Sequence, residues 1–141
     1  MAYQNNSVQA YRQTRVKTAS PGRLVVMLYD EALRQIDIAL SNIDNGPGSY
    51  DTVNAAILKA QDVMTELTVS LDLDQGGDIA QNLFRLYMFF SDRLLAANFK
   101  KDAAPLKEIR TMIESLRDAW QQIAAESPVR QTPNSGVNIA G

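Results

Sequence analysis

The chain has 141 residues, a formal net charge of −2 and a hydrophobic fraction of 45%, which together predict one globular domain rather than a disordered chain. It contains no cysteine and no histidine. Disulfides, zinc sites, Ser-His-Asp or Cys-His catalysis and histidine-containing di-iron bundles are therefore excluded. The slightly acidic charge balance argues against nucleic acid as a partner.

The beginning of the chain lacks the continuous apolar core of a secretion signal. The longest purely apolar run, Leu24–Tyr29, is far too short to cross a bilayer. We therefore expect a cytoplasmic protein without membrane insertion.

Residues 1–19 are polar and include Arg12, Arg15 and Lys17 but no acidic residue, which predicts an N-terminal arm or a short capping helix. Ser20 and Pro21 then mark the start of a helix, because serine caps free amides and proline is tolerated at the first helical position. The apolar pattern continues to Ile43, and Asn45-Gly46-Pro47-Gly48 ends it.

Three more helices follow, from about Asp51 to Leu71, from about Asp78 to Phe99, and from between Asp102 and Pro105 to just before Pro128. In each, apolar residues recur at intervals of three and four, which is typical of a helix that buries one face. The expected core positions of the first of these helices are Val53, Ile57, Ala60, Met64, Leu67 and Leu71. Those of the next are Ile79, Leu83, Leu86, Phe90, Leu94 and Ala97, and those of the last are Leu106, Ile109, Ile113, Leu116, Trp120 and Ile123.

No segment alternates with a period of two, so no strand is expected. Four helices of similar length with short connections predict an all-α, antiparallel up-down four-helix bundle over residues 20–127. The arm over residues 1–19 precedes the bundle, and a flexible tail over residues 128–141 follows it.

The acidic residues do not form a recognisable chemical site. Asp72, Asp74 and Asp78 have a spacing similar to that of a calcium loop, but Gly76 and Leu83 occupy two positions where oxygen ligands are needed. A helix-to-helix turn explains these acids better. With no phosphate-binding loop and no sign of a cleft for paired carboxylates, we expect no enzymatic activity, no cofactor and no metal.

The third helix carries a second apolar stripe, made by Phe84, Met88, Leu95 and Phe99, on the side opposite its expected core face. It could bind a partner's apolar helix, form a homodimer face or lie beneath the arm; an imperfect helical register would also produce it. Val8 and Tyr11, three residues apart in the arm, could form one docking turn. Attraction of the basic arm to the acidic stretch 30–98 would help such docking, although salt screens surface attraction.

The segment from Tyr11 to Leu33 contains a tyrosine, then Thr-Ala-Ser-Pro, then a leucine and Met-Leu-Tyr-Asp-Glu-Ala, and so resembles the flagellin-specific export chaperones, the FliS family. Four further blocks match the family's pattern in order: KAQDVMTEL (59–67), SLDLDQGGDIAQNLFRLYMFF (70–90), LLAANFKKDAAPLKEI (94–109) and LRDAW (116–120). The resemblance covers about residues 8–123. The chain departs from the family's frequent Tyr-Asp-Tyr-Met at Tyr87-Met88-Phe89-Phe90, which adds apolar surface and removes an acid.

The resemblance implies a cytosolic, non-enzymatic four-helix bundle without a cofactor. Such a protein would bind the C-terminal segment of newly made flagellin, prevent premature polymerisation and deliver it to the flagellar type III export gate. The family's arm is credited with covering part of the flagellin surface and with contacting the gate, and Val8 and Tyr11 match its apolar positions. The alternative is a self-associating adaptor or regulator for another flagellar export client.

Overall fold

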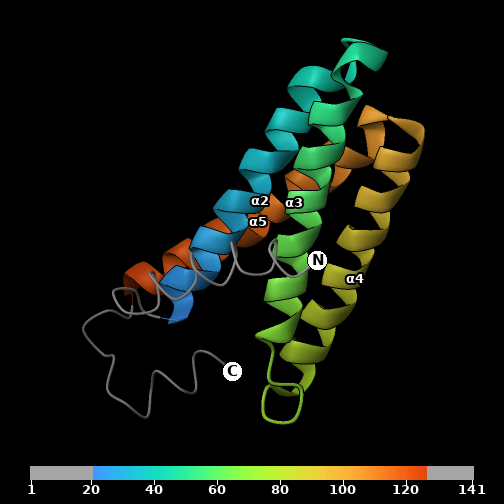
Figure 1. Cartoon of the computed structure of the whole chain (residues 1–141). Helices are drawn as coiled ribbons and strands as arrows, with labels where there is room; N and C mark the ends of the chain where they lie inside the picture. The colour runs from blue at the N-terminus through green and yellow to red at the C-terminus, as the bar shows by residue number, and fades with distance from the viewer. Residues whose placement is uncertain (1–20, 127–141) are drawn as a thin grey trace.

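The computed structural model describes residues 21–126, which form four long helices and no strand (Figure 1). These are α2 (Pro21–Ile43), α3 (Tyr50–Val69), α4 (Gly77–Lys100) and α5 (Ala103–Glu126), with a short 3-10 turn, η1 (Pro47–Ser49), between α2 and α3. The four helices expected from the sequence are confirmed. The expected arm (1–19) and tail (128–141) lie outside the described residues.

The turns between the helices follow from local chemistry. Gly46 and Gly77 adopt φ values of 89° and 61°, which side chains with a Cβ rarely take. Asp72 accepts a hydrogen bond from the backbone N–H of Gln75 at 3.0 Å, so this acid stabilises the α3–α4 turn. Asp102 accepts one from the N–H of Ala104 at 3.0 Å and thereby caps the start of α5.

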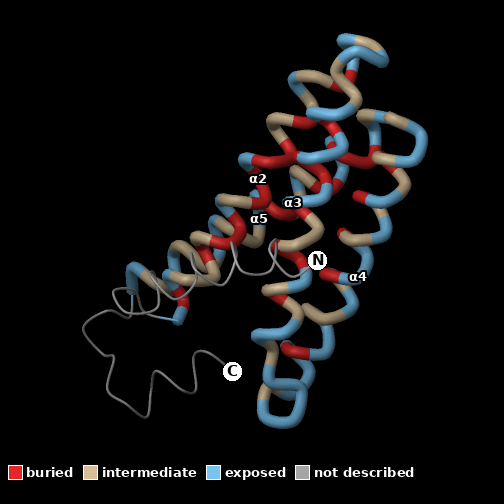
Figure 2. Tube along the Cα trace, viewed as in Figure 1, coloured by how far each residue is buried: buried red, intermediate tan, exposed pale blue. Residues whose placement is uncertain are grey.

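The helices form an antiparallel bundle in which α2 packs against α3 and α5, and α4 packs against the same two helices from the diagonal position. Buried residues lie along the inner sides of all four helices (Figure 2). Figure 1 also shows that α2 and α5 lean away from α3 and α4 toward the end where α2 begins and α5 ends. The expected up-down topology is therefore confirmed, with one splayed end.

The core positions expected on α3 are buried, apart from half-buried Leu71 beyond its end. On α4 the expectation is wrong at its first turn, where Ile79 is 66% exposed and Ala80 is buried instead. Ile123, near the end of α5, is also exposed rather than buried. Both isoleucines lie at the splayed end, where the described helices are farther apart (Figure 1). Farther along α4, the expected core residues Leu83 and Leu86 are half-buried, and Tyr87, which was not among the expected core positions, is buried.

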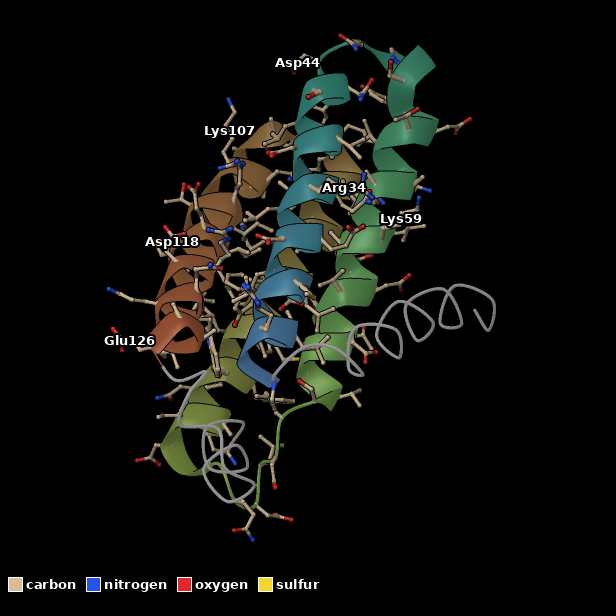
Figure 3. The ribbon with its side chains drawn as sticks, turned by 90° about the vertical axis from the view of Figure 1, so that its left-hand side faces the viewer. Arg34, Asp44, Lys59, Lys107, Asp118 and Glu126 are labelled. Atoms are coloured by element: carbon tan, nitrogen blue, oxygen red, sulfur yellow. The ribbon has the colours of Figure 1, made fainter. Side chains whose placement is uncertain are left out.

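Two ion pairs join α2 to α5. Asp37 accepts a hydrogen bond from Arg110 Nε at 2.6 Å, and Asp30 accepts one from Arg117 Nε at 2.7 Å. The partners are seven residues apart on both helices, so the two pairs fit only the antiparallel register. Figure 3 shows this side of the molecule, where Lys107, Asp118 and Glu126 point away from the bundle. The outer surface of α5 is therefore charged.

Tyr29 of α2 and Tyr87 of α4 meet across the bundle's diagonal. Their hydroxyl oxygens are 2.6 Å apart, and both residues are buried. Burial raises the pKa of both phenols above the ordinary value of 10.0, and at Tyr29 the neighbouring Tyr87 adds to the effect. The folded protein consequently holds both phenol protons more tightly than the unfolded chain does.

Alkaline pH should therefore destabilise the bundle. Below about pH 10 both phenols are protonated in the folded and the unfolded chain, and the pair contributes fully to the free energy of unfolding. Above that pH, the free energy of unfolding should fall by up to about 1.4 kcal/mol per pH unit for each phenol, because only the unfolded chain loses its phenol protons. Urea unfolding between pH 8 and about pH 11 measures this slope. The Tyr29→Phe/Tyr87→Phe variant, which keeps the rings and every other titrating group, should show a shallower decline. Equal declines in the two proteins would contradict the prediction.

Candidate functional site

Four apolar side chains on the outside of α4 form what we call the α4 ridge: Phe84, Met88, Leu95 and Phe99. Phe84 is half-buried, whereas Met88, Leu95 and Phe99 are 40%, 61% and 85% exposed. The exposure rises from the start of the ridge to its end. Burying such side chains stabilises a complex, because each removes apolar surface from water.

Contacts to both neighbouring helices orient the ridge. Asn98 donates to Asn54 Oδ1 of α3 at 2.7 Å, and Arg93 donates to Glu108 of α5 at 2.9 Å. At about 100° per residue around the helix axis, the ridge lies on the same side of α4 as Asn98, but farther from the core, and on the opposite side from Arg93. It therefore stands on the surface that α4 shares with α3.

The α3 side of this surface contributes Leu58, which is 36% exposed. The Asn54–Asn98 contact sets the antiparallel register of the two helices. Leu58 lies one turn along α3 from that contact, and Leu95 lies about one turn back along α4, so the two are at the same level. Leu58 thus extends the apolar surface sideways from the ridge.

A polar network lies at the end of α4, next to Phe99 in the sequence. Lys101 Nζ donates to the carbonyl oxygen of Asn98 at 2.7 Å and to Asn98 Oδ1 at 2.6 Å, and lies 5.5 Å from the ring centroid of Tyr50. Lys101 itself takes a left-handed backbone with a φ of 51° and ends α4. These contacts tie the end of α4 to α3, so Phe99 projects from a rigid support.

The structure also exposes apolar residues that sequence reasoning did not single out. Leu58 fell between the expected core positions of α3, and Phe89, next to buried Phe90, was noted only as part of the departure from the family's pattern that adds apolar surface. Val69 and Leu73 are exposed around the α3–α4 turn. No motif marks these residues; mapping the apolar residues of α3 that lie outside its core stripe could have found Leu58.

The ridge contains all four site residues that the sequence predicted within the described part of the chain. The other two, Val8 and Tyr11, lie outside the described residues, so their predicted role stays a prediction. In residues 21–126, no group of three or more acidic side chains could hold a metal ion. No helix in the same range is both long and apolar enough to cross a membrane.

A helical bundle with an exposed apolar ridge has the form expected of a protein that binds other proteins, since such a ridge offers apolar surface for burial. The family model described as "Flagellar protein FliS" matches residues 4–127. The flagellar secretion chaperone FliS of Bacillus subtilis is 34% identical over 96% of this chain and 98% of its own length, and that of Salmonella typhimurium is 31% identical over 92% and 98%. The chain belongs to the FliS family of flagellar secretion chaperones.

Proposed function

We propose that this protein is a cytoplasmic, non-enzymatic chaperone that binds the C-terminal helical segment of newly made flagellin. Binding would prevent premature polymerisation and present the client to the flagellar type III export gate. The exposed α4 ridge is the single observation that carries this proposal. It supplies the apolar surface that an amphipathic client segment needs, and membership of the FliS family makes a flagellar client the natural one.

A client that folds as it binds would suit this surface. The ridge runs over Phe84–Phe99, about 22 Å along the axis of α4 at 1.5 Å per residue. An amphipathic helix laid along it would place apolar residues at intervals of three and four against the ridge and Leu58. Ordering the client costs conformational entropy, which burial of Leu95 and Phe99 offsets.

The N-terminal arm, residues 1–19, has a part in the proposed function. Val8 and Tyr11 would cover part of the apolar surface in the free protein, leave it when flagellin binds, and then contribute to contact with the export gate. Arg12, Arg15 and Lys17 would hold the arm near the acidic bundle through attraction that salt weakens.

Calorimetric titration with a peptide of the last ~40 residues of flagellin, about 60 Å of chain if fully helical, tests the proposal. We expect saturable binding, a negative heat-capacity change and a gain of helical circular dichroism, because apolar burial is coupled to folding. A scrambled peptide of the same composition should bind weakly or not at all. No binding at high micromolar peptide, or equal binding of both peptides, would contradict the proposal.

A further inference from the structure

Two isoleucines at the splayed end lie at the same height on α4 and α5. Arg93 of α4 and Glu108 of α5 form an ion pair at 2.9 Å, which sets the antiparallel register of these two helices. Ile79 lies 14 residues before Arg93 and Ile123 lies 15 residues after Glu108, so each is about 22 Å along its helix from the pair. Both continue the core-facing stripe of their helix, yet they are 66% and 42% exposed.

The apolar surface at this end extends beyond the two isoleucines. The next core-facing residues of the same two helices are half-buried: Leu83, Leu86, Leu116 and Trp120. Helix α2 stays close to α5 here, since a Cβ atom added to Gly22 would lie 3.7 Å from that of Ala124. The exposed apolar surface therefore lies between the α2–α5 pair and the α3–α4 pair, where the helices are farther apart (Figure 1).

We propose that residues 127–141 fold back and dock on this surface, with Val137 and Ile139 against Ile79 and Ile123. The segment lies outside the described residues and follows α5 directly, about one helical turn after Ile123. Its fifteen residues span up to about 50 Å when extended, so its length allows the return. Docking would restrict a segment that the sequence alone predicts to be flexible, and it is independent of what the α4 ridge binds.

The composition of residues 127–141 suits this path. Proline, asparagine, serine and glycine, the residue types typical of turns, follow one another at 133–136 and allow the chain to reverse. Val137 and Ile139 come next at an interval of two, so in an extended segment both side chains point to the same side. The segment would therefore present two neighbouring apolar side chains to the isoleucines.

Charge favours the same end of the bundle. Arg130 is the only charged side chain in residues 127–141. The α3–α4 turn carries three exposed acids, Asp72, Asp74 and Asp78, and residues 70–79 include no lysine or arginine. Attraction between Arg130 and this turn would hold the segment near the splayed end, with a strength that salt reduces.

Trp120 tests the docking, because it is the only tryptophan of the chain and lies half-buried one turn from Ile123. Acrylamide quenching of its fluorescence is measured in the full-length protein and in Val137→Ser/Ile139→Ser. We expect stronger quenching and emission at longer wavelength in the variant, because the released segment would expose the indole ring to solvent. Equal quenching in both proteins would overturn the proposal.

Two controls separate this segment from other causes. Gln131→Ser/Thr132→Ser changes the same segment without removing a large apolar side chain, and should leave the quenching of Trp120 unchanged. Deletion of residues 1–19 removes the arm, which also joins the bundle at this end but is assigned to the α4 ridge by the proposed function. Quenching that increases only without the arm would make the arm the occupant and overturn the proposal.

A spin label gives a second, independent readout, because the natural chain contains no cysteine. The label is attached through Asn138→Cys, and the methyl NMR signals of the isoleucines are recorded. The signal of Ile79 should broaden, whereas that of Ile43, at the opposite end of the bundle, should not. Adding Val137→Ser/Ile139→Ser to the labelled protein should remove the broadening of Ile79 although the length of the segment is unchanged. Broadening that persists would show that the label reaches Ile79 without docking, and would overturn the proposal.

Discussion

Replacing Phe90 with alanine should lower the free energy of unfolding by about 3–5 kcal/mol, the usual cost of emptying the space of a buried phenylalanine. Phe90 has no exposed surface and belongs to the hydrophobic core, where its ring is 6.5 Å from that of Tyr87. Total stability is commonly only about 5–15 kcal/mol, so the variant should lose a large share of it. Urea unfolding followed by circular dichroism measures the loss.

Phe99→Ala is the matched control, because it removes the same atoms from the same helix nine residues away. Phe99 is 85% exposed, so its loss leaves no cavity. Its effect on stability should stay within about 0.5 kcal/mol, as for most surface substitutions. If both variants lost similar stability, Phe99 would be part of a packed interface within the folded chain. The ridge would then not be available to a partner.

The Leu95→Ser/Phe99→Ser variant should bind the flagellin peptide at least about 30-fold more weakly, equivalent to about 2 kcal/mol, the scale of an interface hot spot. These two side chains are the most exposed of the ridge and stand one turn apart on a rigid support. Stability should barely change, because neither side chain is in the core. Calorimetric titration gives the affinity, and thermal unfolding checks the fold.

Ile79→Ser provides the control for this loss. Ile79 is on the same helix and is 66% exposed, close to the 61% of Leu95. It lies sixteen residues before Leu95, about 160° around the helix, and therefore faces away from the ridge. Its replacement should leave peptide affinity within about twofold, a difference below 0.5 kcal/mol. If Ile79→Ser and the ridge double variant lost equal peptide affinity, binding would depend on the total apolar surface of α4 and not on the ridge.

Phe84→Ser is expected to weaken peptide binding less than the ridge double variant does, and to lower stability less than Phe90→Ala does. Phe84 was predicted as a surface residue of the second stripe, but the structure shows it half-buried. Its replacement should therefore weaken peptide binding and also reduce stability somewhat. For this reason the double variant replaces Leu95 and Phe99 and leaves Phe84 in place, so that a loss of binding is not mixed with a loss of stability.

The sequence by itself determined the four helices and their approximate ends. Proline, glycine and acidic capping residues act over a few neighbours, and intervals of three and four are a property of a single helix. For this reason Pro21, Ile43 and the α3–α4 turn were predictable. The second apolar stripe of α4 was predictable for the same reason, since its four residues share one side of one helix. Its binding role, and those of Val8 and Tyr11, remain predictions.

Only the tertiary structure decided which apolar residues are covered. Ile79 and Ile123 continue regular apolar patterns, yet both are exposed because α2 and α5 lean away from α3 and α4 at that end. Periodicity selects the side of a helix, but burial also needs an opposite helix at the same height. Contacts between distant residues were equally out of reach: the Tyr29–Tyr87 pair joins positions 58 apart, and Asp30–Arg117 joins positions 87 apart. Such pairs depend on how the helices are placed, which no local pattern encodes.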